Sequence, residues 1–248
     1  MKYEKMPSMI FGAEIGEKLR IARALCKWPK FSLTSFRMVD ALRRQNIHPQ
    51  TVIDVGANAG QFAVAAVKLL APSKLYAFEP IPQVWEQLKR NTASLPQVEA
   101  HSLALGEAAG ERQFHLNAHS HSSSLLPLGQ GHREAFPNAR EVGSILIKVS
   151  TLDQFFGSLE LPPPVLLKLD VQGYEAKVIA GASAMLARVR WVIAETSLRP
   201  LYDGEPLFLD LVEIMAQTGF KFLRPVGWLT EPRSSEILQL DALFERAR

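Results

Sequence analysis

Two acidic residues, Asp54 and Glu79, each follow a short apolar run and stand 25 residues apart. The segment DVGANAGQ, residues 54–61, carries two glycines that allow close approach of a ligand, and a helix beginning there would offer N–H groups to a carboxylate. Asp54 can accept a hydrogen bond from an amino group, directly or through water, and Glu79 can accept from both hydroxyls of a ribose. This pattern predicts a site for a nucleoside that lacks a pyrophosphate, and S-adenosylmethionine (SAM) is such a ligand.

A nicotinamide-dependent oxidoreductase is the competing interpretation of the same segment. The dinucleotide fingerprint is G-x-G-x-x-G, whose small residues let a pyrophosphate lie against the helix. Asn58 replaces the middle glycine here, and an acid at position 79 disfavours a 2′-phosphate. Binding of S-adenosylhomocysteine but not of NADH would separate the two interpretations.

A second polar cluster, KLDVQGYE at residues 168–175, ends another apolar run. Together with VIDVGANAGQFA, AFEP and TLDQF, the segment LLKLDVQGYEAKVIAGA resembles the FkbM-type methyltransferases, a class of SAM-dependent O-methyltransferases, over roughly residues 51–197. The resemblance implies that Asp170 lies beside the transferred methyl group and that Ser122, Ser123, Ser124 and Leu125 match a serine-containing stretch of the family. The residues expected to contact the cofactor are Asp54, Gly56, Ala57, Asn58, Gly60, Gln61, Glu79, Pro80, Ala104 and Asp170.

Methyl transfer from a sulfonium to an alcohol is an in-line displacement, and the acceptor oxygen must lose a proton. Asp170 is the first candidate for the general base, because a carboxylate close to that oxygen can take the proton. Glu195, at the end of the next apolar run, and His121 are the further catalytic candidates. Simpler roles stay open: Asp170 caps the following helix or pairs with Lys168, and Glu195 caps a strand.

A long polar segment, residues 118–140, separates two predicted strands and is expected to act as a lid. Solvation of a loop is the simpler alternative. No metal site is predicted, because no cysteine or acidic pair near the loop histidines completes a zinc set, and the sequence does not require a divalent ion at Asp170. The expected acceptor-binding residues are His119, His121, Ser123, Ser124 and Gln172.

From residue 51 the chain alternates apolar runs with helical patterns, which predicts an α/β, Rossmann-like, doubly wound and mostly parallel sheet. Its seven strands, with an antiparallel edge hairpin at the C-terminal end, would form the class I methyltransferase fold. Nine segments of the chain are expected to be strands, and two of them, 112–117 and 144–150, come where the regular alternation stops. The other seven are 51–56, 74–80, 97–105, 165–170, 189–197, 220–225 and 236–246. The expected helices are one or two within 14–46, then 60–70, 82–93, 151–156, 173–187 and one that begins at Pro206.

The 248 residues have ordinary globular composition, with 47% hydrophobic and 21% charged residues. We expect a helical, basic extension over residues 1–48, which packs over the ligand crevice, and a methyltransferase domain over residues 49–248. The extension holds ten Lys and Arg against four acids. It could meet an anionic acceptor or a lipid headgroup, or it could be a solvated helix face.

The single cysteine, Cys26, excludes an intrachain disulfide and is compatible with a cytoplasmic location. Neither a secretory leader nor a membrane span is predicted. We predict O-methylation of a small-molecule or glycan acceptor, at a hydroxyl of a sugar, glycan, glycolipid or polyketide-type metabolite. One alternative is an RNA methyltransferase or binding module that uses the basic extension, but the remaining chain has a net charge of −3, which argues against nucleic acid. The other is a protein that binds partners without catalysis.

Overall fold

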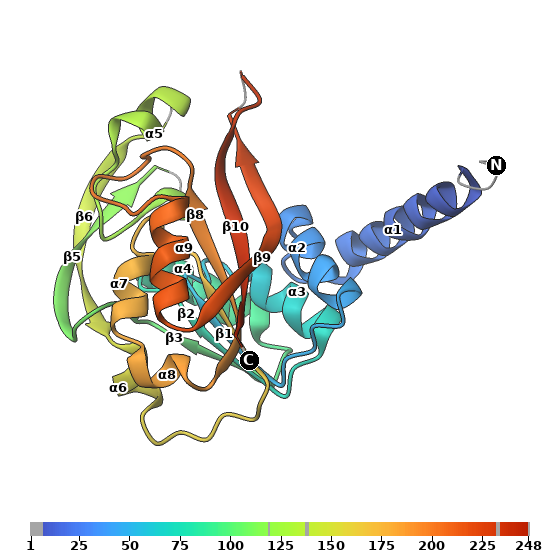
Figure 1. The fold of residues 1–248 in the computed structure, drawn as a ribbon, viewed down its shortest axis with the longest axis horizontal. Helices are drawn as coiled ribbons and strands as arrows, with labels where there is room; N and C mark the ends of the chain where they lie inside the picture. Colours follow the sequence, from blue (N-terminus) through green and yellow to red (C-terminus); the bar gives the residue numbers. More distant parts are fainter. Residues whose placement is uncertain (1–6, 119, 137–138, 232–233, 248) are drawn as a thin grey trace.

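The computed structural model describes residues 7–118, 120–136, 139–231 and 234–247. Within these residues the main sheet has seven strands in the order β3-β2-β1-β7-β8-β10-β9 (Figure 1). The first five of these run parallel, and β10 is antiparallel to both of its neighbours. The predicted Rossmann-like sheet with an antiparallel edge hairpin is confirmed. Its strands are β1 (Thr51–Val55), β2 (Lys74–Phe78), β3 (Val98–His101), β7 (Val165–Leu169), β8 (Val189–Ser197), β9 (Phe220–Thr230) and β10 (Ile237–Arg246).

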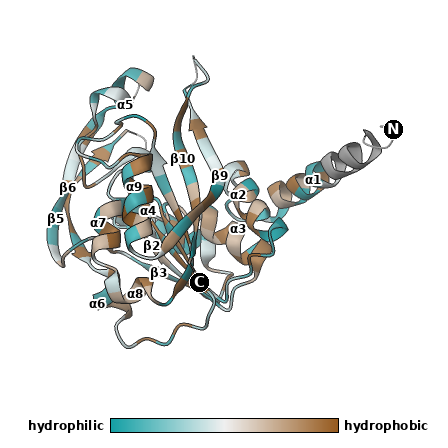
Figure 2. Cartoon of the chain, viewed as in Figure 1, coloured by the Kyte–Doolittle hydropathy of each residue, from teal (hydrophilic) through white to brown (hydrophobic). Residues whose placement is uncertain are grey.

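The central strands are buried because helices cover both faces of the sheet. Helices α2 (Leu33–Arg44), α3 (Gln61–Leu70) and α4 (Pro82–Thr92) cover one face. Helices α6 (Leu152–Phe156), α7 (Glu175–Ala180), α8 (Ser183–Leu186) and α9 (Phe208–Gln217) cover the other. Figure 2 shows the consequence, with brown apolar residues along the central strands and more teal on the outer surface.

The strand order reverses between β1 and β7, since the chain proceeds from β1 to β2 and β3 on one side and from β7 to β8 on the other. In open parallel sheets ligands bind beyond the carboxyl ends of the strands at this switch point. The segments that follow β1, β2 and β7 are therefore the ones that the fold places at a ligand site.

A second, three-stranded sheet departs from the prediction. The expected strand 97–105 is divided: β3 joins the main sheet, whereas β4 (Ala104–Leu105) pairs in parallel with β6 (Glu141–Ser150). Strand β5 (Gly110–Asn117) pairs antiparallel with β6 in the same small sheet. Between them lie the short helices η1 (Ser120–Ser122) and α5 (Gln130–Ala135), so part of the predicted lid is helical.

The expected helix 173–187 is also divided, into α7 and α8. Gly181 follows α7, and an ideal Cβ there would lie 2.1 Å from the backbone oxygen of Gly106. The chain therefore makes a close backbone approach to the segment after β4, and the helix ends at this point.

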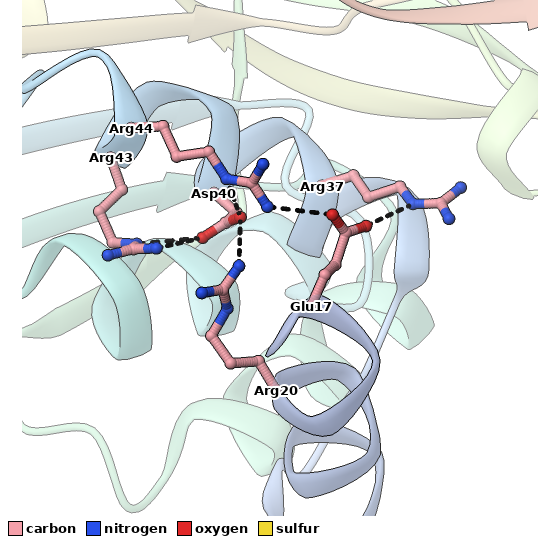
Figure 3. Close-up of polar contacts among 6 residues, drawn as sticks. All are labelled: Glu17, Arg20, Arg37, Asp40, Arg43 and Arg44. Carbon is pink, nitrogen blue, oxygen red and sulfur yellow. Dashed lines mark hydrogen bonds and ion pairs between the residues drawn. The ribbon is translucent and has the colours of Figure 1, made fainter. Parts of the chain in front are cut away.

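Helix α1 (Pro7–Lys27) projects from the body of the molecule, whereas α2 packs against α3 (Figure 1). An ion-pair network joins α1 to α2 (Figure 3). The buried Asp40 carboxylate accepts hydrogen bonds from Arg20, Arg43 and Arg44 at 2.7 to 3.3 Å. Several basic residues of the extension are thus engaged within it. No helix among the described residues is long and apolar enough to cross a membrane.

Candidate active site

Four charged residues share one face of the sheet near the carboxyl ends of its parallel strands. Asp54 on β1 is the register partner of Lys168 on β7, and Glu195 on β8 is the register partner of Asp241 on β10. Side chains alternate along each strand, and the neighbours Val52, Leu166, Ile193 and Leu243 all pack in the cluster under α2 and α3. The same alternation therefore directs the four charged side chains towards that face.

Lys168 is the central cation of this group. Its Nζ lies 3.0 Å from Asp170 Oδ2 and 3.4 Å from Asp54 Oδ1, and the Asp54 side chain is fully buried. Burial opposes the charge of Lys168, but Asp170 and Asp54 outweigh it and raise the pKa of the ammonium. Burial also raises the pKa of Asp54, although Lys168 partly opposes that rise. One permanently charged lysine therefore forms ion pairs with two carboxylates.

The first cavity lies over the ends of β1 and β2 and has an empty volume of about 610 Å³ including its open part. Both oxygens of the Glu79 carboxylate face backbone N–H groups: Asn58 N donates at 3.0 Å and Ile81 N at 2.9 Å. Burial raises the pKa of Glu79 to about 7. Residues on its wall include Gly56, Asn58, Glu79, Pro80, Ala104, His121, Ser123, Asp170 and Gln172.

Glycine is required at position 56 by the packing of the chain as well as by the approach of a ligand. It has φ +81°, and an ideal Cβ would lie only 1.8 Å from the backbone oxygen of Asp170. A side chain at this position would therefore collide with the end of β7. Gly60 also has a positive φ, and it precedes α3. Both glycines of the predicted motif thus serve the turn and the strand packing.

The second cavity, with an empty volume of about 1050 Å³ including its open part, adjoins the first. The two share Gly56, Asn58, His121 and Asp170. Its other lining residues come from the start of α2, the segment around the start of α3, strands β7 and β8, and the β9/β10 hairpin. They include Ser32, Thr34, Ser35, Ala57, Gln61, Lys168, Glu195, Trp228, Gln239 and Asp241.

Gln172 joins the two candidate catalytic carboxylates. Its Nε2 donates to Asp170 Oδ1 at 2.8 Å and to Glu195 Oε2 at 2.6 Å. Its Oε1 accepts from the Tyr202 hydroxyl at 2.6 Å. The backbone of Gln172 has φ +58°, an uncommon conformation for a residue with a side chain, and it is held in place by Ser124, whose hydroxyl donates to the Gln172 backbone oxygen at 2.7 Å.

The two carboxylates differ in proton affinity. Burial alone would raise the pKa of Asp170, but the adjacent Lys168 outweighs burial and holds that pKa below its ordinary value. Burial, with the charge of Asp170 as the next cause, raises the pKa of Glu195 well above its ordinary value. Asp170 is thus a persistent anion with both oxygens engaged, whereas Glu195 is the carboxyl with the higher proton affinity.

The comparison with known protein families decides the class of this site. The family described as "Methyltransferase FkbM domain" matches residues 54–222, more than half of the chain. The chain belongs to the FkbM methyltransferase family. It is accordingly a SAM-dependent methyltransferase, and the oxidoreductase interpretation is set aside.

Two relatives of this FkbM methyltransferase are similar in sequence, one along most of its length and the other along about half. The 2-O-methyltransferase NoeI of Sinorhizobium fredii is 29% identical over 202 residues, which cover 76% of this chain and 82% of NoeI. The hexuronic acid methyltransferase AglP of Haloferax volcanii is 29% identical over 144 residues, which cover 57% of this chain and 54% of AglP. PH1948 of Pyrococcus horikoshii, assigned as an RNA methyltransferase, shows the same fold with a TM-score of 0.52 at 10% identity, over 93% of this chain and 100% of its own.

The residues of this FkbM methyltransferase fit SAM at two points. Apart from the 3.4 Å contact of Lys168 Nζ with Oδ1, no described residue donates to the Asp54 carboxylate, so this buried group can accept a hydrogen bond from an amino group or a water. Each Glu79 oxygen has a second lone pair beyond its backbone hydrogen bond, which leaves capacity for two ribose hydroxyls. Asp54 lines neither cavity, so a contact between its carboxylate and a ligand in the first cavity would have to run through water.

The loop residues predicted to bind the acceptor are divided by the structure. His121 lies where the two cavities meet, and Ser123 lines only the first. Ser124 is fully buried and reaches neither cavity, because its hydroxyl is used by the Gln172 backbone. His119 lies outside the described residues. No group of three or more metal-binding side chains occurs in the part of the chain that the structure describes.

In the sequence analysis Lys168 is considered only as a partner of Asp170, and Asp241, Tyr202 and Trp228 are not singled out. Lys168 and Asp241 carry a detectable signal, since each is a charged residue within an otherwise apolar strand. Tyr202 and Trp228 carry none, because their place in the site depends on contacts with distant segments. The whole extension was expected over the crevice; of its described residues only the start of α2, with Ser32, Thr34 and Ser35, and Met38 line the second cavity, whereas α1 projects from the body of the molecule.

Proposed function

We propose that this methyltransferase transfers a methyl group to a hydroxyl of a sugar, either free or within a glycan, glycolipid or polyketide-type metabolite. The observation that carries the proposal is the polar second cavity, which meets the predicted cofactor cavity at Asp170 and His121. Its serine, threonine, glutamine and carboxylate side chains suit a ligand with many hydroxyls. The names of NoeI and AglP, a 2-O-methyltransferase and a hexuronic acid methyltransferase, support the same substrate class.

SAM, when bound, supplies an electrophilic methyl group on a sulfonium. In this proposal Glu79 binds the ribose and Asp54 the amino group of the cofactor. Gly56, Asn58, Pro80 and Ala104 shape the wall of the first cavity, Ala57 and Gln61 lie on the adjoining second cavity, and Gly60 forms the turn before α3. Asp170 provides a fixed negative charge between the two cavities. Such a charge favours a cation on one side and a polarised hydroxyl on the other.

We assign the acceptor proton to Glu195 in preference to Asp170. Glu195 lines only the second cavity, and its raised pKa makes it a stronger proton acceptor than Asp170, whose pKa is lowered. Both oxygens of Asp170 are already bound, to Lys168 and Gln172. His121 is the alternative proton acceptor, because it lies at the same junction.

The segment 118–140 is proposed to exclude water from the site. The Tyr202 hydroxyl oxygen lies 3.2 Å from the Ser122 backbone oxygen while its proton is directed to Gln172, and Leu126 and Phe136 pack against the cluster around Leu201. These contacts tie the segment to the loop after β8. The division at residue 48, the acceptor contacts of His119 and Ser123 and a cytoplasmic location stay predictions.

The test is methyl transfer from SAM to a panel of pyranosides, a catechol and a transfer RNA, followed by mass spectrometry and chemical mapping of the methylated atom. We expect one methyl ether on a sugar hydroxyl, with S-adenosylhomocysteine formed in equal amount. Methylation of the catechol or the RNA, with no pyranoside modified, would reject the sugar assignment. The RNA outcome is disfavoured because Arg20, Arg43 and Arg44 are engaged by Asp40.

A further inference from the structure

The outer wall of the second cavity comes from two segments that lie outside the FkbM domain match at residues 54–222. The start of α2 contributes Ser32, Thr34 and Ser35, and the β9/β10 hairpin contributes Trp228 and Asp241. The floor, with Lys168, Asp170 and Glu195, lies within the matched domain. Residues beyond the family domain are therefore the ones that can distinguish one acceptor from another.

The ionisable groups on this cavity are strongly biased towards acids. Its lining has three carboxylates, Asp170, Glu195 and Asp241, and a single lysine, Lys168, with His121 as the remaining titratable group. Lys168 is only 4% exposed at its side chain and already pairs with Asp170 and Asp54. It is consequently a poor partner for a carboxylate brought in by a ligand.

Asp241 is the carboxylate on the acceptor side that has no assigned role in proton transfer, since Glu195, which also lines only the second cavity, takes the acceptor proton in the proposed function. It lines the second cavity and not the first, whereas Asp170 lines both. Its position is fixed by Gly227, its register partner on β9: an ideal Cβ on Gly227 would lie 2.2 Å from Asp241 Oδ2. The glycine thus leaves the space that the carboxylate occupies.

One feature opposes this acidic bias. The start of α2 presents the positive end of a helix dipole to the cavity, equivalent to about half an elementary charge. Ser32, the N-cap, already accepts from Ser35 N at 3.3 Å. The charges of Lys168, Asp170 and Asp241 sum to −1, which is larger in magnitude than the half charge of the helix end. The cavity therefore remains unfavourable to an anion even when Glu195 is protonated.

We infer that the second cavity selects sugars that carry no negative charge, and that Asp241 is the residue that rejects acidic sugars. This inference rests on the proposed sugar O-methylation. Trp228, 61% exposed at the same wall, offers an aromatic surface for the apolar face of a pyranose whatever its charge. Shape and charge selection therefore reside in different residues of one hairpin.

The experiment compares kcat/KM for the methyl glycosides of glucose, glucosamine and glucuronic acid, together with the galactose and mannose series. The parent should prefer the uncharged and amino glycosides to the uronide by tenfold or more. Asp241→Asn should raise the ratio of uronide to uncharged glycoside at least fivefold, because one nearby like charge is removed. The ratio cancels any change in kcat that is common to all acceptors.

Two matched variants separate charge from other effects. Glu213→Gln removes the same charge from the exposed surface of α9, on the other face of the sheet, and should leave the ratio unchanged. Trp228→Leu should raise KM for every glycoside and also leave the ratio unchanged. A parent that prefers the uronide, or an Asp241→Asn ratio equal to that of the parent, would overturn the inference while sugar methylation stands. If SAM binds but no glycoside is methylated, the proposed function fails and this inference fails with it.

Discussion

The Tyr202 hydroxyl donates a 2.6 Å hydrogen bond to the amide oxygen of Gln172. This contact fixes which end of the amide faces the site, because the oxygen is held by Tyr202 and the NH2 group is left to Asp170 and Glu195. An amide turned the other way would set an oxygen against two carboxylates. Tyr202 is therefore a positioning residue for both.

Tyr202→Phe should lower kcat about tenfold, since the loss of one buried hydrogen bond costs on the order of 1 kcal/mol and the freed amide can turn. SAM affinity should change less than twofold. The rise of kcat with pH should also move to higher pH, because Glu195 loses part of the donor that favours its ionised form. A kcat–pH profile that matches the parent would show that Tyr202 only packs.

The roles of Asp54 and Glu79 in binding SAM can be tested by calorimetry. Asp54→Ala and Glu79→Ala should each weaken SAM binding at least tenfold, or about 1.4 kcal/mol. Unchanged affinity in both folded variants would remove their assigned roles. Gly56→Ala is unsuitable as a control, because its side chain would collide with the Asp170 backbone.

Glu79 also predicts a pH dependence for binding. Its pKa is about 7 in the free protein because of burial. Ribose hydroxyls donate to the ionised carboxylate, so SAM affinity should rise as pH increases through 7 and become constant above it. Glu79→Gln should flatten this profile, and calorimetry in buffers of different ionisation enthalpy should detect proton release only in the parent.

Replacement of Glu195 and replacement of Asp170 should have different effects on the pH dependence of the rate. Glu195→Gln should preserve the fold and SAM affinity but lower single-turnover methyl transfer by about 10² or more, since an amide cannot accept the proton. Because burial raises the pKa of Glu195, the parent rate should increase with pH as this group ionises. Asp170→Asn should also lower the rate but keep the pH dependence. If Asp170→Asn alone abolishes that dependence, Asp170 is the base.

Asp40 should contribute to stability through the α1–α2 network. Asp40→Asn should reduce the free energy of unfolding by about 1–3 kcal/mol, at the low end for a broken buried pair because the three arginines are partly exposed. Arginine contacts outweigh burial and lower the pKa of Asp40. Its contribution is therefore present above pH 3.8 and is lost as pH falls through the lower folded pKa.

Urea unfolding measures this effect, with Glu17→Gln as the comparison. Glu17 is 28% exposed and pairs with Arg44 and Arg37, so its loss should cost less than about 1 kcal/mol. Equal losses in the two variants would indicate that burial of Asp40 adds nothing.

The fold was predictable where the pattern is local. The apolar run before Asp170 and the turn around Gly56 define β7 and the β1–α3 junction without any distant contact. The second sheet was not predictable, because the pairing of Ala104 with Val149 joins segments far apart in the chain. The same reason hides Tyr202, whose partner Gln172 is 30 residues away.

The site shows the same division. Strand-end acids such as Glu79 and Glu195 are visible in the sequence, since a charge after an apolar run is conspicuous. Whether such an acid is a fixed anion or a proton acceptor is decided by neighbours on other strands. Asp170 has Lys168 beside it and Glu195 does not, and this difference sets their opposite pKa directions.

The space between Gly227 and Asp241 has a consequence for how this family diversifies. A side chain at position 227 and the Asp241 carboxylate in its present orientation exclude each other, because the Cβ of the first would lie 2.2 Å from Oδ2 of the second and would turn the carboxylate away. The two positions should therefore covary among homologous sequences, with an acid at 241 found only beside glycine. Homologues with a larger residue at 227 should carry a small or neutral residue at 241, so a single pair of columns in an alignment would sort the family by the charge of the molecules it modifies.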